Sequence, residues 1–274
     1  MKTKLKQRVF YDQMGYKVII TGAPQRIVSL VPSQTELLWY LGLDKEVIGI
    51  TKFCVHPDEW FRTKKRIGGT KNLNLVYIAE LKPDLIIGNK EENKEEQVKQ
   101  LMQHYPVWMS DIHNLNDALE MIKGVGTIVG KEEKANELVA NIQEKFKTLI
   151  SLNPLKGGRG AVAYFIWKKP YMTIGKHAFI NSMLEVCNFK NVFSELPSDY
   201  PEVTPEQIRS ANPELILLSS EPFPFSEKHI AEFRQIAPDA KIMLVDGEYF
   251  SWYGSRLLEA PGYFRKVVGK AMDN

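Results

Sequence analysis

Two segments of the chain, a constant 130 residues apart, share one pattern. They are Ile78-Ala-Glu-Leu-Lys-Pro-Asp-Leu-Ile-Ile87 and Ile208-Arg-Ser-Ala-Asn-Pro-Glu-Leu-Ile-Leu217. In each, a helical stretch meets a proline and an acid and then an apolar strand, because proline ends helices. A generic helix–turn–strand motif would explain one such segment. The constant offset between two of them favours two related halves.

The rest of the chain alternates strand and helix patterns, which predicts an α/β fold with mostly parallel sheets flanked by helices. Short apolar runs mark the strands, and apolar residues at helical spacing mark the helices. The predicted strands are 26–30, 47–50, 85–87, 107–109, 161–165, 215–218 and 242–245. The predicted helices are 35–41, 75–81, 115–129, 178–186, 206–211, 228–236 and 255–270, with a capping box at Ser33 and Glu36.

One long helix is predicted between the two halves. Residues 132–150 contain no Gly or Pro and carry apolar residues at helical spacing. At ~1.5 Å per residue such a helix is roughly 28 Å long. The predicted organisation is an extension (1–23), an N-terminal lobe (24–130), a bridging helix (131–152) and a C-terminal lobe (153–274). A ligand cleft is expected between the lobes.

Charge and cysteine content exclude several classes of protein. The chain of 274 residues has 36 basic and 33 acidic residues, a net charge of +3, so nucleic acid is not expected as the main partner. Its two cysteines form no Cys-x-x-Cys motif.

The basic start (Lys2, Lys4, Lys6, Arg8) lacks the apolar segment of a signal peptide. We therefore expect a cytoplasmic protein as the sequence is written, or a periplasmic one if a leader precedes it.

Motifs for catalysis are absent, and no catalytic residue is predicted. The sequence has neither a Walker A motif nor a Gly-x-Ser-x-Gly elbow. Cys54 and His56 are one local pair with metal-ligand potential, since residues two apart in a strand share a face. A buried cysteine and a loop histidine are the favoured interpretation of the pair, because two ligands do not close a metal site.

Aromatic residues follow several predicted strands. Open α/β sheets bind ligands beyond the carboxyl ends of their strands, and rigid aromatics there suit a flat ligand. These residues could instead pack the sheet edges. Arg256 is predicted to open the last helix, where a cation opposes the helix dipole, which indicates an anionic partner or an ion pair. The aromatic candidates are Phe53, Trp167, Tyr200, Trp252 and Tyr253.

The chain from residue 24 onward resembles the substrate-binding proteins of iron-siderophore, haem and vitamin B12 ABC importers, most closely their cobalamin-binding members. The resemblance is carried by Arg26-Ile-Val-Ser-Leu-Val-Pro-Ser-Gln-Thr-Glu-Leu37, Leu81-Lys-Pro-Asp-Leu-Ile-Ile87, residues 173–187 and Glu206-Gln-Ile-Arg-Ser-Ala-Asn-Pro213. It implies two lobes bridged by a rigid helix, with little hinge closure on ligand binding.

The resemblance also implies roles for single residues. Phe53 and Tyr200 fall where the cobalamin-binding members have pocket aromatics, and Glu248 and Arg256 fall near the last polar pocket residues. Two further pocket aromatics are replaced near Thr70 and Asn89, which favours a smaller or more polar ligand. Each lobe of the family presents a permease-docking Glu. Glu206 matches the second, whereas the first falls on Val76, with Glu80 one turn later as a substitute.

The leading hypothesis is a monomeric binding protein without enzymatic activity or a built-in cofactor. It would hold a corrinoid, haem-like or metal-chelate ligand, and an ABC permease is its implied partner. A second hypothesis is a chelatase-like enzyme that handles a metal or tetrapyrrole, using His56, Cys54 and Glu248. A third is a cytoplasmic ligand sensor on the same fold.

Overall fold

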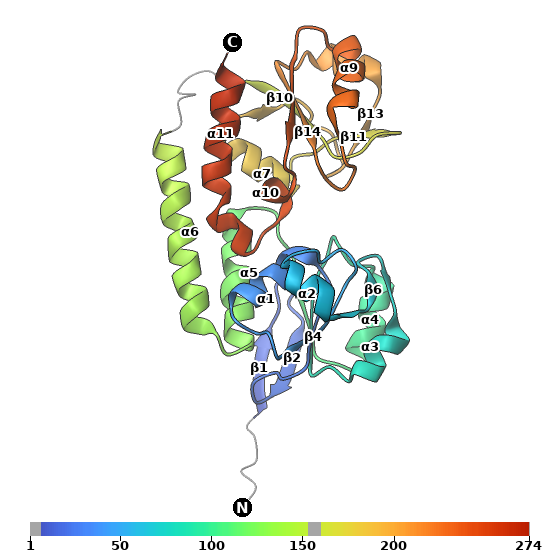
Figure 1. The fold of residues 1–274 in the computed structure, drawn as a ribbon, viewed down its shortest axis with the longest axis vertical. Coiled ribbons are helices and arrows are strands. Elements are labelled where there is room, and N and C mark those ends of the chain that lie inside the picture. The colour runs from blue at the N-terminus through green and yellow to red at the C-terminus, as the bar shows by residue number, and fades with distance from the viewer. Residues whose placement is uncertain (1–6, 153–159, 274) are drawn as a thin grey trace, which may run out of the picture. The chain divides into compact units, whose positions relative to one another are not determined.

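The computed structural model describes residues 7–152 and 160–273, which belong to two compact units (Figure 1). Each unit is built around its own parallel sheet. Unit 1 contains the chain up to Ile112, together with Asn116–Ala140 and Tyr253–Arg256, and unit 2 contains His113–Leu115, Asn141–Trp252 and the chain from Leu257.

Unit 1 contains a five-stranded sheet of order β5-β4-β3-β8-β9, in which every pair of neighbours is parallel. Its strands are joined through helices, as parallel neighbours require. The elements of the chain up to the long helix are β1 (Gln7–Tyr11), β2 (Lys17–Thr21), β3 (Ile27–Ser29), α1 (Pro32–Tyr40), β4 (Val47–Ile50), α2 (Asp58–Thr63), β5 (Lys65–Arg66), β6 (Gly68–Gly69), β7 (Asn72–Leu73), α3 (Leu75–Leu81), β8 (Leu85–Asn89), α4 (Glu95–Met102), β9 (Val107–Ser110), α5 (Leu115–Ile128) and α6 (Glu132–Leu152).

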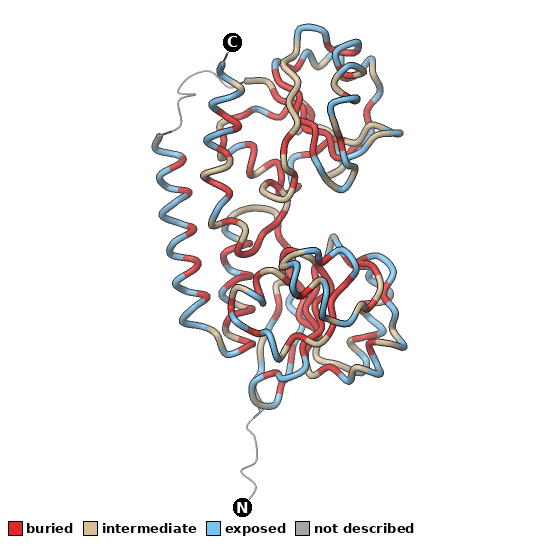
Figure 2. The backbone as a smooth tube through the Cα atoms, viewed as in Figure 1, coloured by how far each residue is buried: buried red, intermediate tan, exposed pale blue. Residues whose placement is uncertain are grey.

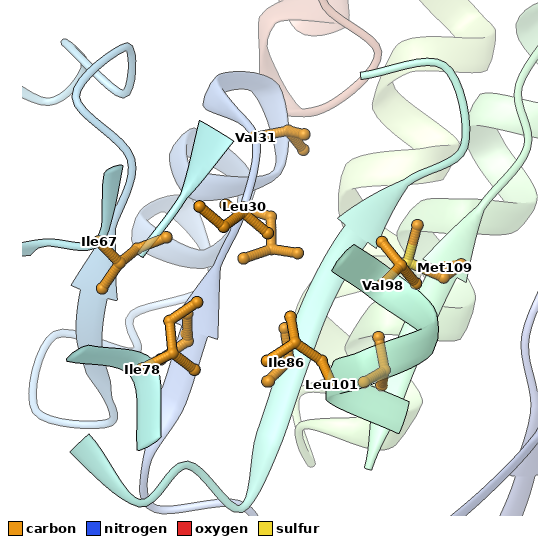
Figure 3. Close-up of a cluster of buried hydrophobic side chains, with 11 residues drawn as sticks. Leu30, Val31, Ile67, Ile78, Ile86, Val98, Leu101 and Met109 are labelled. Carbon is orange, nitrogen blue, oxygen red and sulfur yellow. The ribbon is translucent and has the colours of Figure 1, made fainter. Parts of the chain in front are cut away.

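The core of unit 1 lies between the sheet and helices α3 and α4. Figure 3 shows Ile86 of β8 among side chains from both helices, including Ile78 of α3 and Leu101 of α4. All five residues of β8 are buried, which is typical of a parallel strand covered on both faces. The unbroken apolar run that predicts this strand therefore reflects its central place in the sheet.

Unit 2 contains a four-stranded parallel sheet of order β12-β10-β14-β15. Its core is rich in aromatic rings, with Phe165 at ring-centroid distances of 4.7 Å from Phe233 and 6.5 Å from Phe193. The elements are β10 (Ala161–Phe165), β11 (Tyr171–Met172), α7 (Phe179–Val186), β12 (Lys190–Asn191), β13 (Glu202–Val203), α8 (Pro205–Ala211), β14 (Leu215–Ser219), α9 (Glu227–Ile236), β15 (Lys241–Val245), α10 (Glu248–Ser251), the 3₁₀ turn η1 (Ser255–Leu258) and α11 (Ala260–Met272).

The repeated sequence pattern corresponds to the same local structure in both units. Helices α3 and α8, and strands β8 and β14, have bounds that differ by 130 residues throughout. Each helix has a side-chain N-cap, Asn74 in one and Thr204 in the other. Each also ends in a left-handed residue, Lys82 (φ 46°) or Asn212 (φ 45°), directly before the proline. The two segments thus fold as one structural unit used twice.

Helix α6 contributes to both units, with Glu132–Ala140 in unit 1 and the residues from Asn141 in unit 2. Along its length buried and exposed residues alternate at helical spacing (Figure 2). A single apolar stripe therefore packs against the protein while the other side meets solvent. The buried residues are Ala135, Leu138, Val139, Ile142, Phe146 and Leu149.

Two predicted helix starts differ from the structure because of proline. Helix α1 begins at Pro32 after the N-cap Val31 and has no side-chain cap, so the predicted capping box at Ser33 and Glu36 is wrong. The last helix begins at Ala260 rather than Ser255, with Pro261 in its first turn. Proline lacks an amide hydrogen and favours the first turn, where that donor has no helical partner.

The first described residues form an antiparallel hairpin of β1 and β2. It packs on unit 1 through Gln13, whose amide donates to the Met109 carbonyl (3.1 Å). Asp12 in its turn accepts the amides of Met14, Tyr16 and Met109, and burial raises the pKa of this carboxyl. No helix within 7–152 and 160–273 is long and apolar enough to cross a membrane.

Close packing of α5 against α6 yields a prediction. A Cβ added at Gly126 would lie 2.2 Å from the Cβ of Ala135, so Gly126→Ala must push the helices apart. We expect the free energy of unfolding to fall by about 1–3 kcal/mol, measured by urea denaturation.

Gly269 on α11 provides the matched control. No heavy atom lies within 4 Å of a Cβ added there, so Gly269→Ala tests helix propensity alone. This variant should be neutral or more stable by up to about 1 kcal/mol. Equal effects of the two substitutions would contradict the packing argument.

Candidate functional site

The carboxyl edges of the two parallel sheets are the first place to look for a ligand site. In each unit the connections that leave this edge carry exposed or partly exposed aromatic side chains. Two of the predicted residues, Phe53 in unit 1 and Trp167 in unit 2, are exposed at these positions.

Phe53 lies in the loop that follows β4. Its ring contacts the backbone at Gly69, where an added Cβ would lie 3.1 Å from the ring. The ammonium group of Lys52 lies 5.0 Å from the ring centroid, within cation–π range. The loop thus presents an aromatic ring with a positive charge over one of its faces.

Asn89, at the carboxyl end of β8, organises the neighbouring loop. Its buried carboxamide donates to the Ser110 hydroxyl (3.0 Å) and accepts the amides of Glu91 (2.9 Å) and Glu92 (3.1 Å). Asn93 in turn donates to the carbonyl of Thr70 (3.1 Å). The family resemblance implies a pocket aromatic near Asn89. This chain has there a side-chain carboxamide whose oxygen is already hydrogen-bonded to backbone amides.

Arg256 forms an ion pair with Glu36 of α1. Its Nε donates to the Glu36 Oε2 at 3.1 Å, and the two side chains are only 14% and 16% exposed. The segment that carries Arg256 lies tightly on the first turn of α1, where a Cβ at Gly254 would lie 2.6 Å from the Ser33 carbonyl oxygen. Of the interpretations left open for Arg256, the geometry therefore shows the intramolecular ion pair.

Cys54 and His56 lie in the loop between β4 and α2 rather than in a strand. Cys54 is fully buried, with its Sγ 3.1 Å from the hydroxyls of both Thr35 and Thr51. Burial raises the pKa of this thiol, which disfavours the thiolate that a metal requires. Among the described residues no three His, Cys, Asp or Glu side chains gather as a metal site.

Trp167 follows β10 in unit 2 and is the first of three rings that pack edge-on against one another. Its ring centroid is 5.7 Å from that of Phe223, which lies 5.4 Å from the ring of His229. Burial lowers the pKa of His229, with the nearby charges of Lys168 and Lys228 as further causes. The carboxylate of Glu232 accepts hydrogen bonds from Lys168 and Tyr171 beside this array. Because Lys168 and Tyr171 follow Trp167 in the chain, these contacts hold the segment that carries Trp167.

Trp252 is buried rather than exposed. Its indole Nε1 donates to the Glu221 carboxylate (3.0 Å), which also accepts from the Ser251 hydroxyl. Tyr253 is likewise buried. Glu248 is partly exposed in α10, and its amide donates to Asp246 (3.1 Å). We expect Glu221, which no sequence pattern distinguishes, to support the Trp252 region.

Tyr200 lies in a loop of unit 2 that packs against the segment just before helix α7. The amide of Gly175 donates to the Asp199 carbonyl (2.8 Å), and a Cβ at Gly175 would lie only 2.0 Å from the Ser198 carbonyl oxygen. Only glycine permits this close approach. Tyr200 itself is partly exposed.

Glu80 and Glu206 are exposed on the repeated helices α3 and α8. Glu206 lies in the first turn of α8, where its own amide and the Thr204 hydroxyl lower the pKa of its carboxyl. Val76, at the matching position of α3, is 72% exposed. The two units therefore present one acidic and one apolar side chain at equivalent positions.

The sequence matches the Periplasmic binding protein family over residues 27–238, and the chain belongs to this family. A Bacillus subtilis relative, described as an uncharacterized ABC transporter substrate-binding lipoprotein (YvrC), is 32% identical, and the match covers 79% of this chain and 71% of the relative. The vitamin B12-binding protein of Pectobacterium carotovorum is 25% identical over 86% of each chain.

Solved structures show the same fold. The vitamin B12-binding protein BtuF of Vibrio cholerae superposes with a TM-score of 0.80 at 20% identity, covering 92% of this chain and 99% of that one. Haem-binding and molybdate-binding periplasmic proteins are also similar in structure. The predicted family and the α/β fold with parallel sheets are confirmed, and the family is one of binding proteins rather than enzymes. The individual site residues remain predictions.

The Glu36–Arg256 ion pair predicts a loss of stability when it is broken. Glu36→Gln removes the carboxylate from a largely buried guanidinium, so we expect the free energy of unfolding to fall by about 2 kcal/mol. Urea denaturation at neutral pH measures this change.

The exposed pair of Asp58 and Arg62 is the control. Its side chains are 67% and 74% exposed, so solvent screens the interaction. Asp58→Asn should cost no more than about 0.5 kcal/mol. A loss as small in Glu36→Gln would show that the Arg256 pair does not hold this segment in place.

Proposed function

We propose that the protein is the ligand-binding component of an ABC importer and carries a corrinoid, haem-like or other metal-chelate ligand. The observation that supports this function most directly is the family match across residues 27–238. Relatives named for vitamin B12 binding, and similar structures named for haem binding, suggest the ligand class.

The exposed aromatics at the carboxyl edges of both sheets support a flat ligand. Phe53 offers a ring with the Lys52 ammonium over one of its faces, and Trp167 offers an indole that packs edge-on against Phe223. Large rigid aromatics bury much ligand surface at a small cost in conformational entropy. Trp252 and Tyr253 are buried, so in this proposal they act through packing, whereas the partly exposed Tyr200 and Glu248 contact the ligand.

The relatives also bear on where the protein works. The family is named periplasmic, and the Bacillus subtilis relative is described as a lipoprotein. These names favour the expectation of an exported protein over that of a cytoplasmic one. We therefore propose that the ligand is bound outside the cytoplasmic membrane.

Ligand binding is tested by equilibrium titration with cyanocobalamin, haemin and a ferric hydroxamate chelate, followed by tryptophan fluorescence. Phe53→Ala and Trp167→Ala should each raise the Kd of the bound ligand at least tenfold, because each removes an aromatic contact surface. Binding of the variants is measured by calorimetry, since Trp167 is itself a fluorophore.

Trp39→Ala is the matched control. Trp39 is an exposed aromatic in the last turn of α1, and this end of the helix lies away from the carboxyl edge of the sheet. Its Kd should stay within twofold of the unmodified protein. If none of the three probes binds, the ligand class is wrong; if Trp39→Ala weakens binding as much as Trp167→Ala, the site is wrong.

The implied permease is tested separately. We propose that Glu206, with Glu80 in the other unit, docks on basic residues of the membrane component. Glu206→Arg should lower the recovery of ABC permease peptides from detergent-solubilised membranes at least fivefold, measured by mass spectrometry, with an unchanged ligand Kd.

Glu137→Arg on the exposed side of α6 controls for the charge reversal. Recovery should not change in that variant. If Glu206→Arg and Glu137→Arg recover the same amount of permease, α8 is not the docking surface. Ligand affinity is measured independently, so a failure of docking would leave the binding function standing.

A further inference from the structure

Lys52 and Phe53, neighbours in the loop after β4, lie together against the backbone of β6. A Cβ added at Gly69 would lie 3.1 Å from the Phe53 ring and 3.3 Å from Cε of Lys52. The Lys52 amide donates to the Gly68 carbonyl (2.8 Å), which joins the loop to β6. Strand β6 therefore supports both side chains, and the aliphatic part of Lys52 follows the backbone while its ammonium group reaches outward.

The charge of Lys52 is not neutralised by an acid of this chain. Its ammonium group lies 5.0 Å from the Phe53 ring centroid, and none of the ion pairs among the described residues includes it. Lys90, at the carboxyl edge of the same sheet, differs because it pairs with Asp111 at 2.6 Å. Lys52 thus combines an exposed cation with an exposed aromatic ring, and the ring is 51% exposed.

The exposed aromatic of unit 2 has a different neighbour. Lys168 follows Trp167 directly and pairs with the carboxylate of Glu232, and these two charged side chains are only 16% and 34% exposed. The charge of Lys168 is therefore balanced within unit 2. At Phe53 the described part of the chain supplies no such carboxylate.

This difference limits the ligands that suit Phe53. A ligand that covers the exposed part of the ring also removes water from the ammonium group over its face. Desolvation of a cation is unfavourable unless an opposite charge and hydrogen bonds replace the water. A carboxylate of the ligand would supply both through a charge-assisted hydrogen bond.

We propose that the ligand carries an ionised carboxylate at the rim of its flat metal chelate and that Lys52 binds this group. This assignment rests on the proposed function and narrows its ligand class to chelates with a negatively charged rim. In this arrangement Phe53 provides apolar contact area, and Lys52 determines specificity for charge.

The test compares two macrocycles with and without a carboxylate, using the full chain and calorimetry. Haemin is paired with haemin dimethyl ester, and a monocarboxylic acid of cyanocobalamin is paired with cyanocobalamin itself. For each macrocycle that binds, the acid form should bind at least tenfold tighter than the neutral form at 50 mM salt. The difference should shrink at 500 mM salt, because salt screens the interaction.

Variants of Lys52 assign this preference to one side chain. Lys52→Gln should weaken binding of the acid form at least tenfold and leave the Kd of the neutral form within twofold. Lys52→Arg retains the charge and should retain the preference. The matched control is Lys147→Gln, which removes an exposed lysine of α6 and should change neither Kd by more than twofold. Circular dichroism verifies that every variant is folded.

The outcomes separate this proposal from the binding function on which it rests. Equal binding of the acid and neutral forms would overturn the role of Lys52 and leave the binding function standing. A Lys52→Gln variant that keeps the preference, or that loses both forms equally, would do the same. If none of the four probes binds, the proposed ligand class fails and the assignment of the carboxylate fails with it.

Discussion

Complete burial of two central strands is the constraint on which both units depend. Every residue of β8 and of β14 is buried, so each strand needs neighbours on both edges and cover on both faces. The helix before each strand must therefore end abruptly and return the chain to the sheet. A left-handed residue followed by proline achieves this in both units, at Lys82-Pro83 and at Asn212-Pro213. Because each sheet is parallel, all of its strands have their carboxyl ends at one edge of that sheet.

The carboxyl edge of each sheet explains how candidate site residues are held. The loops leaving these edges are fixed by bonds within their own unit: Asn89 holds the loop after β8 in unit 1, and Glu221 holds Ser251 and Trp252 after β15 in unit 2. Such supports leave one aromatic side chain exposed at this edge in each unit, Phe53 and Trp167. A rigid frame with a few exposed aromatics is suited to binding rather than to catalysis, and the family to which the chain belongs is one of binding proteins.

Charge is distributed unevenly in this chain, although its total is close to zero. The first 24 residues are strongly basic, and the exposed carboxylates Glu80 and Glu206 lie on the repeated helices. In the function proposed above, the carboxylates of these two helices meet basic residues of a permease. At the position where α8 has Glu206, α3 has the exposed apolar residue Val76, so the equivalent surfaces of the two helices differ in charge.

The sequence by itself determined the fold class, the long helix and the repeated helix–strand segment, because continuous apolar runs and helical spacing report burial directly. Strand β4 and helix α3 have the predicted bounds. Tertiary structure alone decided the roles of single side chains. Arg256 pairs with Glu36, 220 residues away, and Cys54 meets Thr35, since such partners are brought together only by folding. The hairpin was also missed, because its alternating pattern is short and its inward face is defined only by the surface of unit 1 that covers it.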